Sequence, residues 1–194
     1  DAIMTLAAAG TATSRIELGT AVTPTYPRHP TAMAQQALTA ASMANNRFTL
    51  GIGLSHKMVI EDMLGLSFDR PARHMKEYLE VLLPLLQGKV VDYDGEEYQV
   101  HGTQLDVAGV DDVPVVVAAL GPMMLKMTGE LTDGTSTWMV GSKTMEEHIA
   151  KTMNSAAADA GRPAPRVIGG FPVVLTNNVE DVRDSLAEPL AIYG

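Results

Sequence analysis

The sequence predicts an α/β protein built on a parallel sheet. Five strand-like segments alternate with helix-like segments along the chain, and strict alternation of this kind brings the strands into parallel pairing. Residues 113–120 are apolar almost throughout, as expected for a strand covered on both faces. With 46% hydrophobic and 19% charged residues, the composition is that of a globular domain. Two architectures fit these observations, an open doubly wound sheet and a closed (β/α)8 barrel.

The first third of the chain predicts helix, strand, helix and strand. Residues 2–12 are small and apolar, and Asp1 stands where a signal peptide would carry a positive charge, so we expect a helix. Residues 15–22 then predict a buried strand. Residues 30–44 predict an alanine-rich packing helix, because their apolar side chains recur at helical spacing. Residues 47–53 predict the second strand, which ends in glycines.

The middle of the chain adds an amphipathic helix and an excursion from the repeat. Residues 69–86 place apolar side chains on one helical face. Asp94–Gly95 between Val- and Tyr-rich arms predicts a hairpin insertion near residues 89–110.

The last part of the chain predicts three further strand and helix units. We expect the strands at residues 113–120, 134–140 and 166–176, with helices at 122–131, 144–161 and from 179 to about 191. Thr144 and Glu147 form a capping-box pattern, and Asn178 is placed to cap the last helix.

Charge and residue usage exclude several functional classes. The formal charge of −9 and the lack of a Lys/Arg run argue against a nucleic-acid partner. The sequence contains no cysteine, so it offers no disulfide or zinc-thiolate site. Its five histidines lack the spacing of metal ligands, and we expect no metal site. No apolar run approaches the roughly 20 residues of a membrane span, and we expect a soluble, cytoplasmic protein without a membrane partner.

Four segments of the sequence carry a family resemblance. They are LGTAVTPTYPRHPTAMAQQALTAASMANNRFTLGIG, GLSHKMVIEDMLGLSFDRPARHMKEYLEVLLPLL, VPVVVAALGPMMLKMTGELTDGTSTWMVG and AADAGRPAPRV. These segments resemble the luciferase-like monooxygenase family, in particular its actinobacterial F420-dependent branch. The resemblance implies a (β/α)8 TIM barrel in which residues 15–22, 47–53 and 113–120 are the third, fourth and fifth strands. About five of eight βα units would then be present, in a single partial domain over residues 1–194 that is truncated at both ends.

The resemblance also implies where a cofactor would bind. In this family the third strand often ends in a bulge with a non-proline cis peptide that backs the cofactor ring. In this sequence the bulge would consist of Thr20, Ala21, Val22 and Thr23, although an ordinary strand-to-loop bend is the alternative.

Three further strand ends carry candidate site residues. After the second strand, Gly53, Ser55 and His56 lie at the face where barrel enzymes carry their sites. His56 could exchange protons with a substrate, although a loop histidine is more often structural.

The later strand ends supply the remaining candidates. At the third strand end, small residues before a helix would let backbone N–H groups approach a phosphate, although they could equally serve packing. The only tryptophan, Trp138, could line a pocket or be buried under a helix. The residues at the strand-to-helix junction are Ala118, Ala119, Leu120 and Gly121.

The resemblance implies an F420-dependent oxidoreductase that transfers a hydride between the deazaflavin and a small organic substrate, and a homodimer is possible. The first alternative is an FMN-dependent monooxygenase on the same barrel. A second is a non-catalytic fragment of such a barrel. A Rossmann sheet is disfavoured because GIGLSH lacks the third glycine of the dinucleotide fingerprint.

Overall fold

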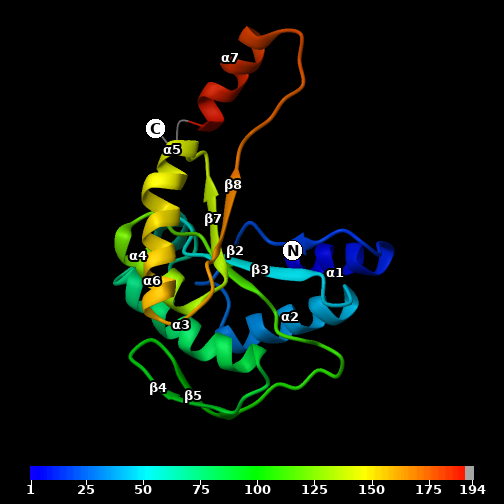
Figure 1. The fold of residues 1–194 in the computed structure, drawn as a ribbon, viewed down its shortest axis with the longest axis vertical. Coiled ribbons are helices and arrows are strands. Elements are labelled where there is room, and N and C mark those ends of the chain that lie inside the picture. The colour runs from blue at the N-terminus through cyan, green and yellow to red at the C-terminus, as the bar shows by residue number, and fades with distance from the viewer. Residues whose placement is uncertain (191–194) are drawn as a thin grey trace.

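The computed structural model describes residues 1–190, with side chains as far as residue 187. Its main sheet is parallel, in the order β1-β3-β6-β7-β8, and β2 also pairs with β3 (Figure 1). The parallel α/β class and the five strand positions predicted from the sequence are therefore confirmed. The strands are β1 (Leu18–Gly19), β2 (Thr23–Pro24), β3 (Phe48–Gly53), β6 (Val115–Val117), β7 (Gly134–Trp138) and β8 (Arg166–Gly170).

Helices α2, α3, α4 and α6 pack along the sheet, whereas α7 stands apart from it beyond the ends of β7 and β8 (Figure 1). Helix α1 packs on α2, α2 on α3, and α4 on α6. No helix within residues 1–190 is long and apolar enough to span a bilayer. The helices are α1 (Ala2–Ala12), α2 (Pro30–Met43), η1 (Val59–Met63), α3 (Pro71–Leu86), α4 (Pro122–Leu131), α5 (Ser142–Thr144), η2 (Met145–Ala150), α6 (Lys151–Asp159) and α7 (Val179–Leu190), where η marks a π-helix.

The two faces of the sheet differ in side-chain size. In β3, the side chains of Phe48, Leu50 and Ile52 are buried in the main core, which α2 and α3 also enter. Side chains alternate between the faces of a strand, so Gly51 and Gly53 belong to the opposite face. That face of β3 is therefore almost without side chains toward the end of the strand.

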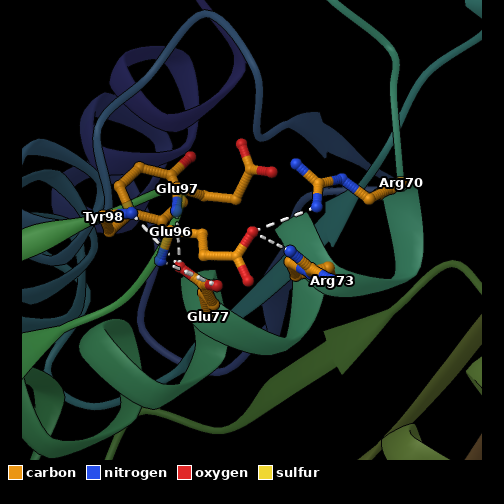
Figure 2. A network of polar contacts seen from close by, with 6 residues as sticks. All are labelled: Arg70, Arg73, Glu77, Glu96, Glu97 and Tyr98. Carbon is orange, nitrogen blue, oxygen red and sulfur yellow. Dashed lines mark hydrogen bonds and ion pairs between the residues drawn. The ribbon is translucent and has the colours of Figure 1, made fainter.

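An antiparallel pair, β4 (Val91–Asp94) and β5 (Gln99–Thr103), interrupts the repeat where the sequence predicts a hairpin. Its turn is fixed to α3 by the buried carboxylate of Glu77, which accepts the backbone N–H groups of three consecutive turn residues (Figure 2). Burial alone would raise the pKa of Glu77, but these hydrogen bonds hold it below its usual value. The N–H donors belong to Glu96, Glu97 and Tyr98.

Several boundaries differ from the sequence prediction, and the strand expected at residues 113–120 covers only Val115–Val117. The strand expected at residues 15–22 is divided into β1 and β2. The strand expected at 166–176 ends at Gly170, because its partner β7 ends at Trp138 and offers no further residue to pair. The helix expected to begin at Thr144 begins at Ser142, so Thr144 lies inside it and caps nothing. The predicted end of the last helix, near Ala191, falls outside the described residues.

Candidate functional site

The carboxyl ends of parallel strands meet at one edge of the sheet, and a bulge lies at this edge between β1 and β2. Gly19 pairs with Thr49, and Thr23 pairs with Ile52. Four steps along the first strand thus correspond to three steps along β3, which defines a bulge of one extra residue. The Ala21–Val22 peptide within it is cis, as the family resemblance implies.

Thr20 fastens the bulge to β3 with its side chain. Its buried hydroxyl accepts the Gly51 N–H at 2.8 Å and donates to the Gly51 carbonyl at 2.6 Å. A Cβ at Gly51 would lie 1.8 Å from the Thr20 carbonyl oxygen. Only glycine therefore allows the two strands to approach this closely.

Val22, Gly53 and Ala118 meet beside the bulge and form a shelf of small residues. A Cβ at Gly53 would lie 2.7 Å from Cγ2 of Val22 and 3.2 Å from Cβ of Ala118. The Ala118 N–H donates to the Ile52 carbonyl at 2.9 Å, which holds the end of β6 against β3. The neighbouring Thr23 hydroxyl is buried and lacks a hydrogen-bond partner among the described residues.

The junction between β6 and α4 presents the amino end of a helix. Gly121 is the N-cap of α4 and Pro122 is its first residue, and no described side chain caps this helix end. Leu120 is exposed, whereas Ala119 is buried in a second, smaller core. His148 of η2 contacts the Leu120 carbonyl through Nε2 at 3.3 Å and so ties the junction to the next unit.

Trp138 ends β7, and its side chain is 45% exposed. A Cβ at Gly170, its partner in β8, would lie 2.9 Å from Cε3 of the indole. The ring therefore lies against the end of β8 rather than under a helix.

Ser55 and His56 follow β3 in the loop that leads into η1. Ser55 has a positive φ of 64°, and His56 is exposed. The His56 carbonyl accepts the Ile60 N–H at 3.0 Å at the start of η1. A catalytic role of His56 stays a prediction.

Sequence reasoning missed a polar group on the helix side of the same edge. Thr25, directly after β2, donates its N–H to the Gly53 carbonyl at 3.0 Å and contacts Nε2 of His74 at 2.9 Å. His74 lies on α3, and burial lowers its pKa to about 4, although the Glu77 carboxylate opposes this shift. The sequence signal was a histidine on the apolar face of an amphipathic helix.

These features suit a planar conjugated ring attached to an anionic chain. The shelf offers the small apolar side chains of Val22 and Ala118, packed over Gly53, to a ring, and the uncapped helix end offers N–H groups and a positive dipole to a phosphate. Within the described residues, no group of three His, Asp or Glu side chains is placed to hold a metal ion.

The chain is similar in sequence to a reductase and to an F420-dependent dehydrogenase. It is 34% identical over 122 residues to the 5,10-methylenetetrahydromethanopterin reductase of Archaeoglobus fulgidus, covering 63% of this chain and 36% of that protein. It is 35% identical over 134 residues to the F420-dependent glucose-6-phosphate dehydrogenase of Nakamurella multipartita, covering 66% of this chain and 39% of that protein.

The fold agrees with these matches. The coenzyme F420 dependent tetrahydromethanopterin reductase from Methanopyrus kandleri superposes with a TM-score of 0.75 at 27% identity, over 87% of this chain and 53% of that one. The chain thus spans about half or less of the length of these relatives. The sequence profile of the family described as luciferase-like monooxygenase matches residues 1–194, and the chain belongs to this family.

Proposed function

We propose that the chain is part of an F420-dependent oxidoreductase that transfers a hydride between the deazaflavin and a small organic substrate. The structural observation that carries the proposal is the shelf where Val22, Gly53 and Ala118 meet beside the Thr20–Thr23 bulge. The relatives described as F420-dependent support the choice of cofactor.

Each part of the edge has its own role in this proposal. Thr20, Ala21, Val22 and Thr23 back the ring of the cofactor, and the small side chains of the shelf pack against it. Residues 118–121 and the amino end of α4 receive the anionic chain. When bound, the deazaflavin supplies two electrons as a hydride.

The remaining candidate residues act on the substrate side. Trp138 covers the edge at β7 with an apolar ring and excludes water there. His56, with Ser55 beside it, accepts or donates the proton that accompanies hydride transfer, because an imidazole nitrogen can serve as a proton donor or acceptor. The substrate is a small molecule that reaches this edge from solvent.

An FMN-dependent monooxygenase is the second candidate, because the family description itself names monooxygenases. The shelf accepts a flavin as readily as a deazaflavin, so the two functions differ in cofactor selectivity. A barrel fragment without turnover is the third possibility.

A fluorescence titration of the purified protein with coenzyme F420 and with FMN distinguishes the three. Tighter binding of F420 supports the oxidoreductase. Tighter binding of FMN supports the monooxygenase, and binding of neither refutes both. Gly53→Val is the matched variant, because its side chain would collide with Val22 and Ala118, displace the shelf and so weaken binding of either ring.

A further inference from the structure

A chain of hydrogen bonds runs from the β4–β5 hairpin to the carboxyl edge of the sheet. The Tyr98 hydroxyl lies 3.5 Å from Nδ1 of His74, and Nε2 of His74 lies 2.9 Å from the Thr25 hydroxyl. That hydroxyl lies 3.4 Å from the Gly53 carbonyl oxygen, which also accepts the Thr25 N–H at 3.0 Å. Three segments distant in sequence are thereby joined.

The proton positions along these hydrogen bonds follow from the donors available. A carbonyl only accepts, so we assign the Thr25 hydroxyl as the donor to Gly53 and as the acceptor from His74. Nε2 of His74 therefore carries the proton, which leaves Nδ1 of the neutral ring to accept from the Tyr98 hydroxyl. Burial favours this neutral ring, since it lowers the pKa of His74 to about 4.

Packing holds the imidazole in the one orientation that permits both contacts. The Tyr26 ring stacks on it at 3.8 Å between centroids and 3° between planes. Tyr78 and Tyr98 surround it at 5.8 and 5.7 Å. Glu77 is the charged group that faces it from its own helix, and it anchors the Tyr98 N–H. The hairpin, α3 and the segment after β2 are thus joined around His74.

We infer that His74 is a positioning residue that, through Thr25, fixes the Gly53 carbonyl and with it the shelf at the cofactor site. The inference rests on the proposed function, because Gly53 is placed there against the cofactor ring. His74 lies on the helix side of the sheet and acts through Thr25. The hairpin insertion consequently takes part in shaping the site.

Two readouts test this inference in the purified protein. The dissociation constants of F420 and FMN report on the shelf, and hydrogen exchange of the Thr25 amide reports on its bond to Gly53 without any cofactor. His74→Phe keeps a ring for stacking on Tyr26 but removes both hydrogen bonds, whereas His74→Gln keeps a donor toward Thr25. Thr25→Val removes the hydroxyl alone.

We expect His74→Phe and Thr25→Val each to weaken cofactor binding about tenfold, because each leaves a buried polar group without its partner. The Thr25 amide should exchange about tenfold faster in His74→Phe, and His74→Gln should restore most of both losses. The control is Tyr93→Phe, which removes a hydrogen bond from the same hairpin to Glu80. It leaves intact the hydrogen bonds that join Tyr98, His74 and Thr25, which we call the relay. It should change neither readout.

The outcomes separate the inference from the proposed function. Failure of the unaltered protein to bind F420 or FMN refutes the proposed function and with it a role in positioning a cofactor, while amide exchange still decides whether the relay exists. If the protein binds a cofactor and His74→Phe lowers only the melting temperature, His74 is a packing residue and the inference is wrong. Equal damage by His74→Gln and His74→Phe would overturn the donor assignment.

Discussion

Replacing Glu77 with glutamine tests which contacts hold the β4–β5 hairpin on α3. Oε2 of Glu77 accepts the N–H groups of Glu97 at 2.8 Å and Tyr98 at 3.2 Å, and Oε1 accepts that of Glu96 at 3.2 Å. An amide has one oxygen, so it can replace only one of these two acceptors. With that oxygen in the Oε2 position, the amide NH2 would face the Glu96 N–H, and two donors would oppose each other.

The expected loss in the free energy of unfolding follows from these contacts. One buried N–H without an acceptor costs about 1–3 kcal/mol, and loss of the charge from two remaining hydrogen bonds adds about 1 kcal/mol. We therefore expect Glu77→Gln to lower the free energy of unfolding by about 2–4 kcal/mol, measured by urea denaturation at pH 7.

The matched control is Glu96→Gln in the same turn. The Glu96 side chain is 63% exposed and forms ion pairs with Arg70 and Arg73 (Figure 2). Exposed pairs contribute little, so this variant should lose at most about 1 kcal/mol. Equal losses in the two variants would refute the argument that burial and backbone hydrogen bonds, rather than charge pairing, hold the turn.

The pH dependence gives an independent check of the same reasoning. The folded-state pKa of Glu77 lies below its unfolded value of about 4.3, so its stabilising contribution is present above that pH. The contribution is lost as the pH falls through the lower folded-state pKa. The difference between the unaltered protein and Glu77→Gln should therefore shrink in acid, and a constant difference would contradict the assignment of a charged Glu77.

Three further predictions follow from single residues. Gly51→Ala should destabilise the protein by more than about 2 kcal/mol, because its Cβ meets the Thr20 carbonyl oxygen, whereas Gly121→Ser should stay within about 0.5 kcal/mol in the same urea assay. His74 has a folded-state pKa of about 4 and an unfolded value near 6.5, so it should cost up to about 3 kcal/mol of stability as the pH falls through this window; His74→Gln should lack that slope. Binding of F420 should quench the fluorescence of the half-exposed Trp138, and Trp138→Phe should remove that quenching if the indole lines the site.

The sequence predicts well those elements that local pattern controls. Amphipathic spacing identifies the helix of residues 71–86, and Asp94–Gly95 identifies the hairpin, because both signals lie within a few residues of the structure they specify. The predicted end of β8 was wrong because it depends on a segment that is distant in sequence. Residues 171–175 are apolar and extended in character, but the strand stops at Gly170 where its partner stops, and strand length depends on that partner.

The candidate site was predicted in part. Small residues at the ends of β3 and β6 pointed to a close approach, and the structure brings Val22, Gly53 and Ala118 together. The relay through His74 could not be predicted, because Thr25 and His74 are 49 residues apart and neither lies in a recognisable motif. Only the packing of α3 under β2 makes them neighbours.

The geometry of the bulge explains why threonine and glycine alternate across this edge. A strand with one extra residue cannot continue the backbone ladder through the insertion, so other groups must bind the β3 carbonyls there. Thr20 binds that of Gly51 on one side of the bulge, and Thr25 binds that of Gly53 on the other. Both acceptors are glycines because a Cβ at either position would collide with the bulge. Thr20 and Thr25, with Gly51 and Gly53, therefore hold the bulge against β3 together. Of the two threonines, Thr25 is the one that contacts His74 and so connects the bulge to α3 and the hairpin.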